Sequence, residues 1–289
     1  MAPLIAVPNA SEGRDRGTID AIGAAFATRA RVLDVHSDPD HGRSVFTLAA
    51  PQGELHEALL AGAREAVERV DLRAHEGSHP HVGALDVAPV VYLDDARRGA
   101  ACAEALTAGA LIGDELELPV FLYGELATRP EHRHRAELRR GGPGSLRTRI
   151  ESGQAVPDFG PRRLHPTAGA LLVTARPPLI AFNVDLVTDD LERARHIAAG
   201  LRETCGGLPG VRAIGLYLPD RGRAQVSLNV EDHRAAPLAT IVEHVREQAE
   251  IAEAELVGLA PAAAFDGFPA DVPLRGFDPR RHLIENALR

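Results

Sequence analysis

The sequence contains no lysine and no tryptophan, and among its 289 residues it has one methionine and two cysteines. Its 32 basic residues are therefore all arginines. Without a lysine amine, the chain cannot form a Schiff base with pyridoxal phosphate or with a carbonyl substrate. A nucleotide-binding P-loop is excluded as well, because that motif needs a lysine to reach the phosphates.

The shortage of cysteine and of long apolar segments bears on where the protein works. Cys102 and Cys205 are too few for a zinc ribbon or a disulfide framework, which favours a reducing compartment. The run from Met1 to Pro8 has no basic residue and too short an apolar stretch for a signal peptide. No apolar stretch approaches the length needed to cross a bilayer. We therefore expect a cytoplasmic protein.

The charge balance limits the partners. With 41 acidic and 32 basic side chains the formal net charge is -9, which disfavours broad attraction to nucleic acid or to an anionic membrane. A local cluster of arginines can still hold a small anionic substrate. The length, with 45% hydrophobic residues, is enough for one large or two modest globular domains.

One order of predicted elements, strand–helix–strand–strand–helix–strand, occurs twice along the chain. This is the ferredoxin-like order, in which an antiparallel sheet carries two helices on one face. In the first copy we predict strands at residues 4–7, 32–35, 45–48 and 87–92, and helices at 17–28 and from Pro51 onward. In the second copy we predict strands at residues 179–186, 211–218, 224–230 and 255–257, and helices after a Thr188 N-cap and at 237–252.

Extra elements lie between the two copies. We predict a helix at residues 100–117 and a strand at 119–123, followed by a glycine-rich run, Gly141–Gly144, that should break any helix, and then by a polar loop. The two prolines after Arg176 indicate a boundary between subdomains of residues 1–176 and 177–289. The predicted fold class is therefore α+β, with two ferredoxin-like (βαββαβ) subdomains.

The sequence has thirteen histidines, and the densest group is the run from His75 to His81. A zinc site built on this run would need two of its side chains on one face and a third ligand from elsewhere. A glycine and a proline interrupt regular structure here, so the spacing fixes no such geometry, and we predict no bound metal. His132 and His134 lie among charged residues and are predicted to be solvated.

His79 differs from the other histidines in its context. It precedes a proline and then a segment, Gly83–Val87, that enters a predicted strand. A loop histidine at the end of a strand is well placed to transfer protons. On periodicity alone, however, a polar loop histidine hydrogen-bonded to the backbone is the favoured interpretation.

Two further loops have two open interpretations each. The loop from Gly160 to Gly169 holds two prolines and two adjacent arginines, so it can lie against a flat ligand and bind carboxylates, or it can simply connect domains. The segment Asn9–Gly13 follows the first strand. It can be a helix-entry turn or can place polar groups at the end of that strand.

Taken in order, a series of segments resembles the formiminotransferase family, the folate-dependent glutamate formimidoyltransferases. The matching segments keep the family order and cover nearly the whole chain up to about Pro261. They are VPNASEG (7–13), LDV (33–35), RSVFT (43–47), HPHVGALDV (79–87), PVFLYGE (119–125), PDFGP (157–161), HPTAGA (165–170), IAFN (180–183), AIGLYL (213–218) and AQVS (224–227).

The resemblance implies two ferredoxin-like subdomains packed across a groove that binds the pteridine of folate and its glutamate tail, and it implies a homodimer. It makes His79 the catalytic residue, with tetrahydrofolate as co-substrate and no metal. Supporting roles fall to Asp34, Arg43, Asp86, Glu125 and Asn183. The implied folate-binding residues are Gly160, Pro161, Arg162, Arg163, Leu164, His165, Pro166, Thr167, Ala168 and Gly169.

The implied reaction belongs to histidine breakdown and one-carbon metabolism. It transfers a formimino group from N-formimino-L-glutamate to N5 of tetrahydrofolate, giving 5-formiminotetrahydrofolate and L-glutamate. A histidine whose pKa lies near neutrality can take the proton from N5 and deliver one to the leaving nitrogen. Some relatives carry a fused cyclodeaminase; here ring closure is expected of a separate protein acting downstream.

Three residues depart from the family pattern. His81 stands where arginine is usual, Asp185 where asparagine is usual, and Gly42 where another asparagine is usual. Three alternatives therefore stay open. They are a transferase of the same mechanism with another formimino or formyl donor, a non-catalytic folate-binding homologue, and a metal-dependent hydrolase that uses His75, His79 and His81.

Overall fold

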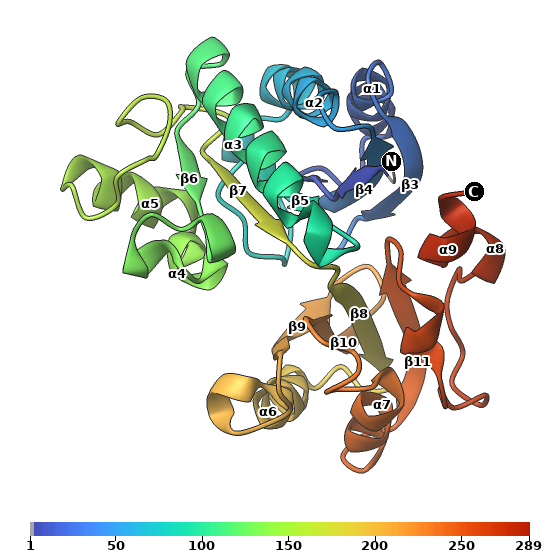
Figure 1. Ribbon diagram of the computed structural model, residues 1–289. Coiled ribbons are helices and arrows are strands. Elements are labelled where there is room, and N and C mark those ends of the chain that lie inside the picture. The colour runs from blue at the N-terminus through green and yellow to red at the C-terminus, as the bar shows by residue number, and fades with distance from the viewer. Residues whose placement is uncertain (1–2) are drawn as a thin grey trace. The chain divides into compact units, whose positions relative to one another are not determined.

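The computed structural model describes residues 3–289, and these form two compact units (Figure 1). The first unit ends at Pro177 and the second begins at Pro178. Met1 and Ala2, which belong to the N-terminal run considered for a signal peptide, lie outside the described residues. Each unit has its own β-sheet and its own hydrophobic core. The predicted α+β class with two ferredoxin-like units is confirmed.

In the first unit, the ferredoxin-like elements supply five of the seven strands of the sheet. The elements are β1 (Leu4–Ala6), β2 (Asn9–Ala10), α1 (Arg16–Phe26), β3 (Arg31–Asp38), β4 (Arg43–Ala50), α2 (Leu55–Arg69) and β5 (Leu85–Val91). β1 and β2 are two halves of one strand, because both pair with β4 and with β5. The strand is interrupted next to Pro8, whose ring nitrogen has no N–H to donate.

The other elements of the first unit add two strands to this sheet, a third helix beside α1 and α2, and two short helices on the second face. They are α3 (Arg98–Glu115), β6 (Val120–Leu122), α4 (Arg135–Arg139), α5 (Gly142–Glu151) and β7 (Leu171–Arg176). β7 pairs in parallel with β5, and β6 pairs in parallel with β7. The predicted helix break is present between Arg139, where α4 ends, and Gly142, where α5 begins. The polar loop predicted after it is wrong, because α5 starts within the glycine run and has Pro143 in its first turn, where no N–H is needed.

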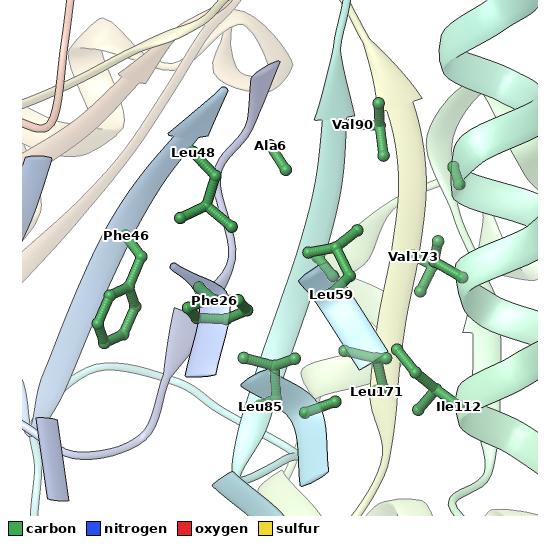
Figure 2. Close-up of a cluster of buried hydrophobic side chains, with 14 of the residues drawn as sticks. Ala6, Phe26, Phe46, Leu48, Leu59, Leu85, Val90, Ile112, Leu171 and Val173 are labelled. Atoms are coloured by element: carbon green, nitrogen blue, oxygen red, sulfur yellow. The ribbon is translucent and has the colours of Figure 1, made fainter. Parts of the chain in front are cut away.

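Two hydrophobic layers hold this sheet between helices. The larger layer lies between the sheet and α1, α2 and α3, and includes Phe26, Phe46, Leu59, Ile112 and Leu171 (Figure 2). A smaller cluster joins β5, β6 and β7 to α4 and α5 through Val87, Phe121, Leu138, Ile150 and Leu172. Each large side chain buried in this way contributes about 1.5–3 kcal/mol to folding. Hydrophobic packing on both faces of the sheet therefore holds the central strand β5 in place.

The second unit is a four-stranded antiparallel sheet with the order β11-β8-β10-β9. Its elements are β8 (Ile180–Leu186), α6 (Leu191–Leu201), β9 (Val211–Leu218), β10 (Arg223–Val230), α7 (Leu238–Arg246), β11 (Ile251–Val257), α8 (Pro279–His282) and α9 (Ile284–Ala287). The inward faces of both long helices pack on Phe182, Val184 and Val226. Phe265, Phe268 and Phe277 from the C-terminal stretch pack against the same core.

The helix ends differ from those predicted, for local reasons. α2 begins at Leu55 rather than at Pro51. The buried carboxylate of Glu104, on α3, accepts hydrogen bonds from the backbone N–H groups of Gly53 and His56 at the start of α2. The N-cap of α6 is Asp190, whose side chain accepts from the backbone N–H of Arg193 at 3.0 Å, and not Thr188. α7 ends early, because its predicted last turn already belongs to the approach to β11. Among residues 3–289, no helix is long and apolar enough to cross a membrane.

Candidate functional site

The loop of residues 75–84, hereafter the His79 loop, leads into β5 and is anchored at several points. The N–H and hydroxyl of Ser78 both donate to the carbonyl of Asp40, at 3.0 and 2.9 Å. The N–H of Val82 donates to the carboxylate of Asp86 at 2.8 Å. Asp86 is the second residue of β5. The loop that carries His79 is therefore hydrogen-bonded directly to a strand of the sheet.

Two hydrogen bonds fix the orientation and the tautomer of His79. A guanidinium nitrogen of Arg43, Nη1, lies 2.8 Å from Nε2 of the imidazole. The other ring nitrogen, Nδ1, lies 2.9 Å from the carbonyl oxygen of Pro80. A guanidinium only donates and a carbonyl only accepts, so Nδ1 carries the hydrogen and Nε2 presents the lone pair. Nε2 is therefore the basic atom of this site.

The surroundings of His79 keep its imidazole neutral. Burial lowers the pKa of His79 well below its ordinary value, and the positive charge of Arg43 lowers it further. Arg139, His41 and Arg135 act in the same direction. At neutral pH the imidazole is therefore uncharged, and an uncharged imidazole can accept a proton as a general base.

The cations around His79 are not all balanced in the same way. Arg139, at the end of α4, is 7% exposed and forms an ion pair with Asp86, which is 1% exposed. Arg43, at the start of β4, has no ion pair with a carboxylate within the part of the chain that the structure describes. Burial, together with the charges of Arg139 and Arg135, lowers the pKa of Arg43 to about 9, so it stays charged at neutral pH.

Four imidazoles meet at this end of the sheet. The rings of His41 and His79 are 5.8 Å apart, and those of His75 and His81 are 4.2 Å apart in an edge-on contact. Nδ1 of His81 donates to the carbonyl of His79 at 3.3 Å. Burial and the neighbouring His81 lower the pKa of His75. Within residues 3–289, no group of three or more His, Cys, Asp or Glu side chains is arranged to hold a metal ion.

The loop of residues 160–169 lies against the His79 loop. The N–H of Ala84 donates to the carbonyl of Ala168 at 2.8 Å, and the N–H of Ala170 donates to the carbonyl of Val82 at 2.9 Å. The two loops can come this close only because Gly83 and Gly169 have no side chains. A Cβ on Gly83 would lie 1.9 Å from the carbonyl oxygen of Ala170, and one on Gly169 would lie 2.0 Å from that of Val82. The two loops thus form one hydrogen-bonded seam.

Within this loop, the residues fall into a packed part and an exposed part. His165 and Gly169 exchange two backbone hydrogen bonds, of 3.1 and 3.2 Å, which close a tight turn. Leu164 is buried, whereas Arg162 and Arg163 are exposed, and Arg163 pairs with Glu117 on the surface at 2.8 Å. The remaining members of the predicted folate-binding set, Gly160, Pro161, Pro166, Thr167 and Ala168, form the backbone of the same loop.

The segment Asn9–Gly13 joins the same seam. The N–H of Ser11 donates to the carbonyl of Ala84 at 2.8 Å, and its hydroxyl donates to the carbonyl of Gly83 at 2.7 Å. The hydroxyl of Ser44 donates to the carbonyl of Glu12 at 2.6 Å. Three segments singled out in the sequence therefore meet at residues 82–84, the part of the His79 loop that enters β5, although they lie far apart along the chain.

Some predicted supporting residues lie elsewhere. Glu125 bonds with the hydroxyl of Tyr92 at 3.0 Å and with Arg98. Tyr92 follows the far end of β5, about 20 Å from Asp86 at the usual rise per strand residue. Asp34 pairs with Thr47 in the middle of the β3–β4 ladder rather than at its Arg43 end.

Asn183 belongs to the second unit. It lies on β8 and donates to Glu255 of β11 at 3.3 Å.

Sequence reasoning missed two buried residues of the first unit. Arg139 was only part of a charged stretch, and nothing local indicates that its partner is a carboxylate 53 residues earlier. The prediction that His132 is solvated is wrong, because it is 1% exposed. Its ring stands edge-on to Phe121 at 5.3 Å and lies 3.7 Å from Asp158. The charged neighbours hid this packing, while the prediction for His134, which is exposed, holds.

Comparison with known proteins gives matches over almost the whole chain. Residues 4–176 match the N-terminal subdomain of the formiminotransferase domain, and residues 181–266 match the formiminotransferase domain. A glutamate formimidoyltransferase of Streptococcus pyogenes serotype M1 is 36% identical over 297 residues, which cover 100% of this chain and 99% of that protein. One from Thermoplasma acidophilum is 37% identical, covering 96% and 95%. The formimidoyltransferase-cyclodeaminase of Rattus norvegicus is 37% identical over 91% of this chain and 51% of its own length.

Proposed function

Because the chain belongs to the formiminotransferase family, we propose that it transfers the formimino group of N-formimino-L-glutamate to N5 of tetrahydrofolate. The products are 5-formiminotetrahydrofolate and L-glutamate. The observation that carries this proposal is the match to two glutamate formimidoyltransferases, at 36% and 37% identity, over almost the full length of both chains. The chain is an enzyme, and tetrahydrofolate is its co-substrate.

His79 moves the protons of this reaction in our proposal. N5 attacks the formimino carbon, and a tetrahedral intermediate forms. N5 then has to lose a proton, and the nitrogen of glutamate has to gain one before it leaves. A neutral imidazole with its lone pair on Nε2 can take the first proton and return it to the second nitrogen. Such a group typically contributes ~100- to 10,000-fold in rate.

The Gly160–Gly169 loop is proposed to bind folate. Its seam with the His79 loop supports this role, because a ligand lying on one loop is then next to the other. Arg162 and Arg163 are exposed, and a guanidinium can bind a carboxylate through two parallel hydrogen bonds. Arg43, Asp86 and the buried Arg139 hold and tune His79 from the protein side. None of these steps calls for a metal.

We also propose the oligomeric state, the compartment and the pathway of this enzyme. We expect the enzyme to act as a homodimer in the cytoplasm, as part of histidine breakdown. The product still needs ring closure and loss of ammonia, which is the work of a cyclodeaminase. The Rattus norvegicus relative carries that second activity in its name, and here we assign it to a separate protein acting downstream.

A direct assay tests the function. Purified protein with tetrahydrofolate and N-formimino-L-glutamate should form 5-formiminotetrahydrofolate, and calorimetry should detect folate binding. A folded protein that neither binds tetrahydrofolate nor transfers the group would remove the proposal. Parallel assays with N-formiminoglycine and N-formyl-L-glutamate, on the natural protein and on His81→Arg, decide whether another donor is used instead.

A further inference from the structure

The donor places two groups side by side. In N-formimino-L-glutamate, the nitrogen that leaves and the α-carboxylate are attached to the same carbon atom. A side chain that protonates this nitrogen therefore has to lie next to the side chain that binds the α-carboxylate. If His79 serves the nitrogen, as proposed above, the carboxylate binder must be its immediate neighbour. The inference below rests on that proposed function for the identity of the donor.

Three arginines act on the charge of His79, and only one of them fits. Arg139 is committed to the buried carboxylate of Asp86. Arg135 lowers the pKa of His79 less than the other two do. Arg43 contacts the ring directly, with its Nη1 atom 2.8 Å from Nε2, the atom that must face the leaving nitrogen.

The charge of Arg43 is poorly compensated inside the protein. Within the described residues, its guanidinium forms no ion pair with a carboxylate and bonds to a neutral imidazole instead. Asp86 and Asp38 offset part of this charge without forming an ion pair with it. A half-buried cation that lacks a direct anionic partner favours a ligand that brings one. Its pKa, lowered to about 9 by burial and by Arg139 and Arg135, reports the same deficit.

We propose that Arg43 binds the α-carboxylate of the donor and, in doing so, releases Nε2 of His79 for proton transfer. Without a donor, the Arg43–His79 hydrogen bond occupies the lone pair that the reaction needs. A charge-assisted bond to a carboxylate is stronger than one to a neutral ring, so the carboxylate draws the guanidinium away. Arg43 thereby selects donors derived from α-amino acids and couples their binding to the exposure of the base.

The other charged groups at this site set the direction of the effect. They act on His79 and Arg43 from three elements and one loop, namely Asp38 on β3, Asp86 on β5, Arg135 and Arg139 on α4, and His41 between β3 and β4. Arg43 is the largest charged cause of the lowered pKa of His79. When the α-carboxylate neutralises Arg43, the pKa of His79 rises and the imidazole becomes a better base.

A kinetic experiment separates binding of the α-carboxylate from other roles. It compares N-formimino-L-glutamate with 4-(formimidoylamino)butanoate, which lacks only the α-carboxylate. Arg43→Gln should raise the KM for the natural donor about 10- to 100-fold, the range for a lost charge-assisted hydrogen bond, and should leave the KM for tetrahydrofolate little changed. With the analogue, Arg43→Gln should not raise the KM, and its kcat should be no lower than that of the natural protein, whose Arg43 stays on Nε2 when no α-carboxylate is bound. Arg43→Lys should restore part of the loss.

The matched control is Arg64→Gln, which removes a surface arginine paired with Glu115. It should leave both donors unaffected. An equal loss with both donors on Arg43→Gln would overturn the inference while leaving the transferase activity established. Thermal unfolding of each variant shows whether the comparison is made on folded protein.

A second measurement needs neither turnover nor a variant. The ring pKa of His79, followed by NMR, should rise in the natural protein on saturation with L-glutamate and should not change with 4-aminobutanoate. A ring pKa that is the same with both compounds would overturn the inference. This measurement still decides the matter if no formimino transfer is found, in which case the proposed function fails separately.

Discussion

The two units share the ferredoxin-like order but treat their buried charges in opposite ways. In the second unit, the carboxylate of Asp185 is paired with Arg221 at 3.2 Å and accepts from Gln225 at 2.6 Å. Glu255 is paired with Arg275 at 2.6 Å. Each of these two buried carboxylates thus has an arginine within ion-pair distance.

In the first unit, Arg43 forms no ion pair with a carboxylate of the described residues. Asp86 balances Arg139, but Arg43 faces a neutral imidazole. An ion pair lowers the cost of burying a carboxylate, whereas a cation that bonds to a neutral histidine keeps its charge available for the carboxylate ligand proposed above. The same topology therefore serves two purposes, and the pairing of charges, rather than the fold, tells them apart.

The largest expected effect is on catalysis in the first unit. His79→Ala removes the only group here proposed to move protons, so kcat should fall by ~100- to 10,000-fold. The change affects a half-buried loop side chain, so the unfolding temperature should stay close to that of the natural protein. Steady-state kinetics with N-formimino-L-glutamate measure the loss. Full activity in this variant would place the base elsewhere.

Breaking the balanced pair of the first unit should chiefly affect stability. Asp86→Asn keeps an oxygen that can accept from Val82 but leaves the buried Arg139 without a counter-ion. The free energy of unfolding should fall by about 3–5 kcal/mol, as for other buried pairs that lose one partner. Denaturant titration gives the value. Adding Arg139→Met should recover part of the loss, and a purely additive result would show that the two residues are not coupled.

The corresponding change in the second unit should cost less. Asp185→Asn leaves Arg221, whose side chain is 18% exposed and can gain water. The amide oxygen can still accept from Gln225. We expect the free energy of unfolding to fall by about 1–3 kcal/mol. If this variant proves as unstable as Asp86→Asn, the contrast drawn between the two networks fails.

The smallest expected effect is a shift in the pH profile. His79 acts as a base only when neutral, and its pKa lies well below its usual range because of burial and Arg43. Activity should therefore persist as the pH falls below about 6.5, the ordinary value for histidine. Arg43→Gln removes a positive charge, so the pKa of His79 rises and the acid limb of kcat/KM moves to higher pH. An unmoved limb would mean that another group controls it.

Much of the fold could be predicted from the sequence, because alternating and helical hydrophobic patterns are local. Each strand and helix predicted for the two ferredoxin-like copies is present, with shifted ends. The misplaced start of α2 depends on Glu104, a side chain of another helix. The position of His79 at the entrance of a strand could also be predicted. Its partners could not, since Arg43 lies 36 residues away and the Asp86–Arg139 pair spans 53.

The glycine seam has a consequence for motion. The segment of residues 84–168 begins and ends at this seam, because the N–H of Ala84 donates to the carbonyl of Ala168. The same few hydrogen bonds therefore hold both of its ends. Local unfolding at that point would loosen the His79 loop and the loop of residues 160–169 in a single event. Opening of these hydrogen bonds should therefore raise the mobility of both loops together.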